Sequence, residues 1–155
     1  MAQLWAQAAA HFYGIHAIKC YSGGTEATAF NPRAVEAMQD VGFDINQMTE
    51  GTNPKYKVRY SDEAPLLTVF SKTYDDSSNP KEDFVAIMTC SHADENCPLV
   101  RGALERIAIT YDDPKNFDGM PEEKMKYRER ALEIGREMLY AFSRVTAVDN
   151  RLNLR

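Results

Sequence analysis

Two short apolar runs constrain the fold of this chain more than any other feature. Residues 84–88, Phe-Val-Ala-Ile-Met, are apolar throughout, and residues 106–111, Arg-Ile-Ala-Ile-Thr-Tyr, form a second run that ends before Asp112. Strands that read as continuous apolar runs are typical of parallel sheets covered on both faces. Because the runs alternate with segments of helical periodicity, we expect an α/β fold, a three-layer sandwich around a central parallel sheet.

Three segments carry helical patterns. Residues 2–13 place apolar side chains on one face and precede Gly14, although no capping residue stands before them. A second helix is expected from Asn31, an N-cap followed by proline, to Gly42. The longest segment, residues 122–145, has an inward stripe made of Tyr127, Ala131, Ile134, Met138, Leu139 and Phe142.

Two more segments have β character. Residues 17–21 predict a short strand that runs into the glycine turn 22–25. Residues 56–74 consist of two β-rich runs separated by polar residues, and they predict a hairpin.

Length, charge and hydropathy limit the class of protein. The 155 residues are 44% hydrophobic, which predicts a single domain over residues 1–155. A net charge of −5 without any block of Lys or Arg argues against nucleic acid and anionic membranes as partners. No apolar run reaches membrane-spanning length and no basic leader opens the chain, so we expect a cytoplasmic protein.

The three cysteines, Cys20, Cys90 and Cys97, are too few and odd in number for a disulfide framework. A transient catalytic disulfide is the favoured use of such a set. A metal site is disfavoured, because Cys90, His92 and Cys97 lack a second ligand pair at the usual zinc spacing. Cys20 lies in an apolar segment and is expected to have a packing role.

Three stretches, in this order, carry a family resemblance. They are Tyr21–Glu26 with Asn31–Ala34, then Thr89–Pro98, then Tyr111–Pro114. Together they resemble the low-molecular-weight tyrosine phosphatases and the thioredoxin-coupled arsenate reductases, two branches of one family. The resemblance covers nearly the whole chain except residues 56–74, which are therefore expected to be an inserted hairpin.

The defining loop of that family, a Cys, five residues and an Arg, is absent from the 155 residues. Glu26 stands six positions after Cys20, and Asn96 stands six positions after Cys90. Since a helix resembling residues 2–13 follows this loop in the family, the resemblance implies that the first strand and the phosphate-binding loop are missing. An internal Met taken as the start and a truncated or degenerate form both remain open. Loss of an interior strand would expose sheet edges, so we expect self-association.

The resemblance also implies roles for particular residues. Cys90 and Cys97 correspond to the redox relay of the arsenate reductases, with thioredoxin as external reductant and no bound cofactor. The alternative is that Cys90 ends a buried strand and Cys97 is an incidental loop thiol. Asp113, before Pro114, corresponds to the general acid, and Asp112 is expected to be a solvated neighbour.

Two classes of function follow from these observations. The first is an oxyanion-handling enzyme acting on arsenate or a phosphate ester. Arsenate reduction is preferred over tyrosine phosphatase activity, because a phosphatase has no use for the cysteine pair and because Lys115 and Asn116, rather than aromatic residues, follow Asp-Pro. The second is a catalytically dead fragment or binding module, since the 155 residues lack the nucleophile and its Arg.

Overall fold

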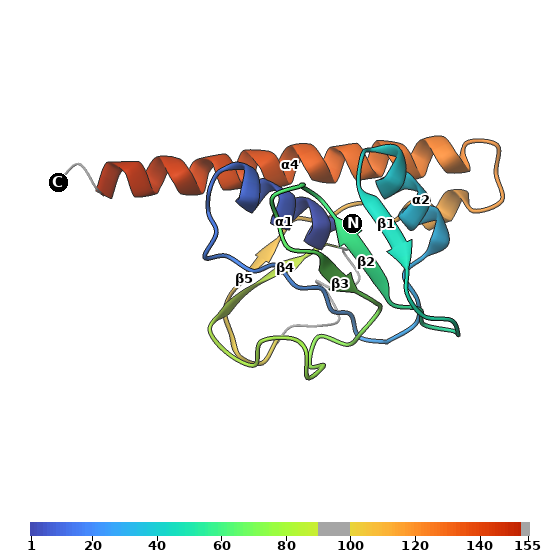
Figure 1. The fold of residues 1–155 in the computed structure, drawn as a ribbon, viewed down its shortest axis with the longest axis horizontal. Helices are drawn as coiled ribbons and strands as arrows, with labels where there is room; N and C mark the ends of the chain where they lie inside the picture. The colour runs from blue at the N-terminus through green and yellow to red at the C-terminus, as the bar shows by residue number, and fades with distance from the viewer. Residues whose placement is uncertain (90–99, 153–155) are drawn as a thin grey trace.

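The computed structural model combines helices with two small sheets and describes residues 1–89 and 100–152 (Figure 1). In chain order the elements are α1 (Ala2–Phe12), α2 (Pro32–Asp40), β1 (Asp44–Gln47), β2 (Tyr56–Arg59), β3 (Leu67–Val69), β4 (Phe84–Met88), β5 (Ala103–Ala108), the 3-10 helix η1 (Pro114–Phe117) and α4 (Glu123–Leu152). The predicted α/β class is confirmed.

The two N-terminal helices end as the sequence predicts. After α1, Gly14 adopts a φ of 71°, its N–H donates to the carbonyl of His11 at 3.0 Å, and the N–H of Ile15 donates to the carbonyl of Ala10 at 2.8 Å. This is a Schellman ending, which requires the left-handed backbone that glycine adopts at little cost. α2 is capped by Asn31, whose side chain accepts from the N–H of Arg33 at 2.9 Å.

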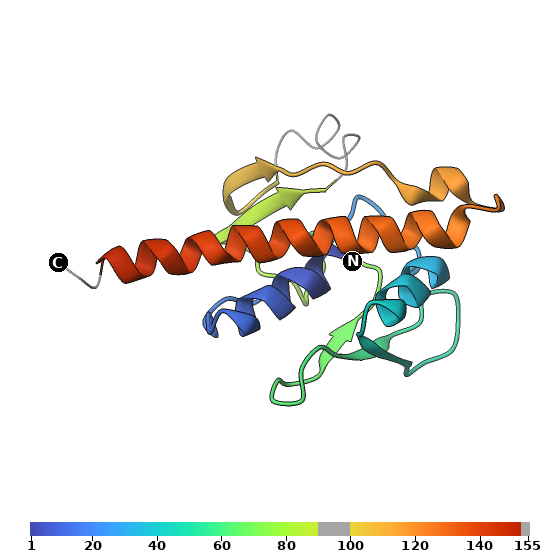
Figure 2. The same ribbon diagram turned by 90° about the horizontal axis from the view of Figure 1, so that it is seen from above.

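Helix α4 runs along the length of the molecule, and α1 and α2 pack against it (Figures 1 and 2). It extends past the predicted end at residue 145. Four members of the predicted stripe are at most 5% exposed, namely Tyr127, Ala131, Ile134 and Met138. Gly135 lets Trp5 of α1 come close, because a Cβ at this position would lie 2.7 Å from the indole Cε2.

The predicted hairpin is confirmed as part of a larger antiparallel sheet. β2 pairs with β3 and also with β1, so the order is β1-β2-β3. β1 was absent from the predicted elements because its sequence, Asp-Ile-Asn-Gln, buries only Ile45 and so carries no apolar pattern.

The two apolar runs form the predicted parallel sheet. β4 pairs with β5 in parallel, with Met88 opposite Ala108. β5 begins at Ala103, earlier than predicted. The prediction that both faces are buried is wrong for β4, because Val85 is 49% exposed and Ile87 is 40% exposed. Helix α4 runs along one side of these two strands (Figure 2).

Residues 17–21 do not form the predicted strand. Their backbone groups bond to side chains of α1 instead: Gln7 Nε2 donates to the carbonyl of Ile18 at 3.3 Å, Gln7 Oε1 accepts from the N–H of Cys20 at 2.9 Å, and Gln3 Nε2 donates to the carbonyl of Cys20 at 3.0 Å. A β-strand requires backbone pairing with a second strand, and none of the described strands pairs with residues 17–21. Only Gly24, farther along, makes a parallel bridge to Thr73.

Candidate active site

Asp113, the predicted general acid, lies in an exposed turn after β5. Its carboxylate Oδ1 accepts from the N–H of Lys115 at 3.0 Å and so caps η1. The ammonium of Lys115 lies 3.8 Å from Oδ2, and 53% of the Asp113 side chain is exposed. The proline at the first position of η1 fixes the backbone after Asp113, so the carboxylate is held at the surface in a defined position.

The Asp-Pro turn and the cysteine segment begin at the same edge of the parallel sheet. Beyond the paired strands, the N–H of Ile109 donates to the carbonyl of Met88, and that of Tyr111 to the carbonyl of Thr89, both at 3.0 Å. Thr89 directly precedes Cys90, and Tyr111 stands two residues before Asp113. The predicted relay residues, Cys90 and Cys97, lie outside the described residues, as does His92.

Tyr127 ties the segment after η1 to the start of α2. Its hydroxyl donates to Asp118 Oδ1 at 2.8 Å and accepts from Asn31 Nδ2 at 3.0 Å. Burial, followed by the hydrogen bond to Asp118, raises the pKa of Tyr127 to about 12. The hydroxyl is therefore neutral at physiological pH and serves as a fixed donor and acceptor rather than as a proton carrier.

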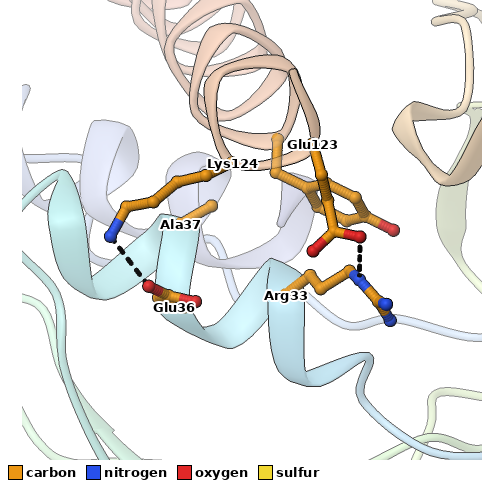
Figure 3. Close-up of a pocket in the computed structure, with 6 residues that line it drawn as sticks. Arg33, Glu36, Ala37, Glu123 and Lys124 are labelled. Atoms are coloured by element: carbon orange, nitrogen blue, oxygen red, sulfur yellow. Dashed lines mark hydrogen bonds and ion pairs between the residues drawn. The ribbon is translucent and has the colours of Figure 1, made fainter. Parts of the chain in front are cut away.

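Ion pairs also join α2 to α4, and Figure 3 shows Arg33 beside Glu123 and Lys124 beside Glu36. Arg33 lies 2.8 Å from Glu123 and 3.6 Å from Asp118, while Lys124 lies 2.8 Å from Glu36. The cavity that these side chains line has a volume of about 20 Å³, enough for one water molecule. This cluster therefore has a structural use: it holds the segment after η1 against α2 and α4.

Tyr111 and Asp112 also face α4. The Tyr111 hydroxyl donates to Glu137 Oε2 at 2.8 Å, and burial together with this hydrogen bond raises the pKa of Tyr111. Arg130 lies 3.7 Å from the carboxylate of Asp112, whose side chain is 98% exposed. Asp112 is thus the solvated neighbour that the sequence predicts.

Cys20 is half-buried and lines a groove on the side of the molecule that carries the hairpin. Burial raises the pKa of the Cys20 thiol to about 11. A thiol in this state is almost entirely protonated at neutral pH and is a poor nucleophile. The predicted packing role is met only in part, because the thiol is half-buried and lies at a groove rather than in the core.

Sequence reasoning missed the residues that hold the Asp-Pro turn in place. Asn31 was recognised as a helix cap, but no local sequence pattern indicates its second bond, which joins it to Tyr127, 96 positions away.

Within residues 1–89 and 100–152, no group of three or more metal-ligating side chains comes together. None of the described helices has the length and apolar character needed to cross a membrane.

Comparison with known proteins identifies relatives. No protein-family model matches the chain. It is 33% identical over 119 residues to a protein of Halalkalibacterium halodurans named arsenate reductase, which covers 76% of this chain and 70% of that protein. Arsenate reductase of Bacillus subtilis is 31% identical over 121 residues, covering 77% and 71%.

Arsenate reductase 2 of Staphylococcus haemolyticus is 32% identical over 94 residues, which cover 61% of this chain. The chain spans only 55% of the length of that relative. The two longer matches agree with the resemblance carried by the Asp-Pro turn and by residues 89–98. The chain belongs to the arsenate reductase family.

Proposed function

We propose that this chain supplies most of an arsenate reductase in which Cys90 and Cys97 form the redox relay. Arsenate takes up two electrons to become arsenite, and two thiols supply them by joining in a disulfide. A nucleophilic thiol first bonds to arsenic. Cys90 then attacks that sulfur, the sulfur–arsenic electron pair stays with arsenic, and arsenite leaves.

Cys97 completes the cycle in this proposal. It attacks Cys90 in the mixed disulfide, which frees the first thiol and leaves a Cys90–Cys97 disulfide for thioredoxin to reduce. Asp113 donates a proton to the oxygen that leaves arsenic when the first thiol binds. The first thiol and its Arg must come from outside the 155 residues, because no Cys is followed by Arg at the required spacing.

One observation carries the proposal beyond the names of the relatives. The bond from Tyr111 to Thr89 brings the start of the cysteine segment and the Asp-Pro turn to one end of the parallel sheet. Carboxyl ends of parallel strands are the usual position of ligand sites in α/β folds. Arsenate as substrate, thioredoxin as partner and a cytoplasmic location are parts of the same proposal.

A second candidate, a catalytically inactive binding module, is favoured by one observation. The 155-residue sequence contains no candidate nucleophile in an anion-binding loop, and the Cys20 thiol is protonated at neutral pH. In that case the chain would keep the fold of the family but would catalyse no reaction. The two candidates differ in whether the codons upstream of Met1 encode Cys, five residues and Arg in frame.

The test compares the 155-residue chain with a version extended by the upstream in-frame codons. We expect arsenite production with thioredoxin only from the extended chain, abolished by Cys97→Ser and retained in the control Cys20→Ser. Hydrolysis of p-nitrophenyl phosphate should survive Cys97→Ser, because it needs no relay. An extended chain that hydrolyses the ester but produces no arsenite would identify a phosphatase. One that does neither would support the binding module.

A further inference from the structure

A groove of about 510 Å³ lies between the hairpin and the N-terminal part of the chain. One wall comes from α1 and the segment after it, including His11 and Lys19. The other comes from β3 and the residues that follow it, including Leu67, Phe70 and Lys72. The groove is thus built with the inserted residues 56–74, and its lining includes neither Asp113 nor Tyr127.

Lys72 is the unusual member of this lining. Lysine is almost never fully buried without a partner, yet Lys72 is only 6% exposed. Its ammonium lies 4.7 Å from the centre of the Phe70 ring, and within the described part of the chain it makes no hydrogen bond or ion pair. Burial lowers the pKa of Lys72, which indicates that its charge is poorly compensated.

Asp76 is the opposing charge that acts on Lys72, and it forms no ion pair with it among the described residues. Asp76 favours the ammonium of Lys72 electrostatically, but its Oδ1 accepts from the N–H of Ser78 at 2.8 Å and from the Ser78 hydroxyl at 2.6 Å. A buried ammonium with only an aromatic face for compensation costs stability. An anion that entered the groove would relieve that cost.

The backbone holds Lys72 in position. The N–H of Gly24 donates to the carbonyl of Lys72 at 3.0 Å, and the N–H of Tyr74 donates to the carbonyl of Gly24 at 3.0 Å. Asn79 adds bonds from its amide to the carbonyls of Ser22, at 3.0 Å, and Thr73, at 3.2 Å. The two walls are therefore joined at this end, and the groove is formed before any ligand arrives.

The charge of the lining favours an anion. Among the described residues that line the groove, none is Asp or Glu, although the chain as a whole has a net charge of −5. Lys19, His11 and His16 join Lys72 on the lining. The amides of Gln3 and Gln7 are already bonded to backbone, and Lys72 differs from Lys19 in that Lys19 is exposed whereas Lys72 is buried.

We propose that this groove binds a small organic anion, whose carboxylate or phosphate group contacts Lys72 and whose apolar body packs against Phe70 and Leu67. Apolar walls with one buried cation are typical of ligand sites in which the charge sets orientation and the walls supply affinity. The groove shares no residue with the Asp-Pro turn.

The probe is 8-anilinonaphthalene-1-sulfonate, an aromatic anion whose fluorescence rises when it binds. Lys72→Met keeps the length of the side chain and removes the charge, and we expect it to weaken binding about tenfold or more. The matched control is Lys55→Met. Lys55 lies 5.1 Å from the same Phe70 ring but is exposed and does not line the groove, so its loss should leave binding unchanged.

A second variant keeps the test decisive if Lys72→Met fails to fold. Lys19 is exposed and lines the groove, so Lys19→Glu reverses a charge there without disturbing the core and should also weaken binding. Displacement of the probe by benzoate or by phenyl phosphate identifies the preferred head group. Equal binding by wild type and folded Lys72→Met, an equal loss in Lys55→Met, or no effect of Lys19→Glu would overturn the proposal.

Discussion

The side-chain amide of Asn31, which caps α2, donates a 3.0 Å hydrogen bond to the hydroxyl of Tyr127 on α4, 96 positions along the chain. The same hydroxyl donates to Asp118, just after η1. One phenol thus joins three separate elements around the Asp-Pro turn. Tyr127 itself is 3% exposed, whereas the side chain of Asp118 is 36% exposed and also lies 3.6 Å from Arg33.

Tyr127→Phe should lower the free energy of unfolding by about 0.5–1.5 kcal/mol, because the Asn31 amide and the Asp118 carboxylate lose their shared partner while Asp118 keeps Arg33 and access to water. Urea denaturation of the two proteins measures the difference. Tyr140→Phe is the matched control, since Tyr140 lies on the same helix but is 68% exposed. Equal stability of all three proteins would show that the contact contributes nothing.

The same tyrosine predicts a pH dependence at alkaline pH. The pKa of Tyr127 is raised from 10.0 to about 12 in the folded chain, so the folded state favours the protonated form. The resulting stabilisation is complete below pH 10 and is lost as pH rises towards 12. We expect wild type to lose more stability than Tyr127→Phe between pH 9 and 11 in thermal unfolding. Parallel curves would contradict the assignment.

Cys20 should react slowly with iodoacetamide in the folded chain. Its pKa is raised from 9.0 to about 11, which reduces the thiolate about 100-fold at neutral pH. Peptide mapping by mass spectrometry after alkylation at pH 8 should show Cys20 largely unmodified when folded and modified in urea. Fast alkylation in the folded state would mean that the thiol is not desolvated.

Gly135→Ala should destabilise the chain, although alanine is the better helix former by about 1 kcal/mol. A Cβ at this position would lie 2.7 Å from Trp5 Cε2 and 2.9 Å from Cζ2, closer than real contacts allow. Trp5 packs edge-on against Phe43 with ring centres 5.0 Å apart, so it cannot move away without loss of that contact. Increased thermal stability of the variant would show that the indole relocates easily.

Self-association is predicted from the open face of the parallel sheet. Val85 and Ile87 alternate along β4, and Ile107, opposite Ile87, is 39% exposed. Apolar side chains on one exposed face favour contact with another chain. Sedimentation velocity should show concentration-dependent association that Val85→Thr with Ile87→Thr reduces. A monomer at all concentrations would remove this prediction.

Sequence alone determined the elements whose signals are local. The caps at Asn31, Gly14 and Gly42 define the ends of α1 and α2 through bonds within a few residues, and they appear as predicted. The apolar runs predicted β4 and, with its bounds shifted, β5, because β-branched and aromatic residues favour strands even where one face is exposed. The Asp-Pro turn and the exposure of Asp112 were likewise predicted from the local sequence.

Tertiary structure alone decided the rest. Residues 17–21 have strand-like composition but bond to Gln3 and Gln7, because a strand exists only where another strand supplies its partners. The contact between Asn31 and Tyr127 and the burial of Lys72 in a groove depend on how distant segments pack. Composition and periodicity indicate the secondary structure that a segment prefers. These features depend instead on which distant residues pack against the segment.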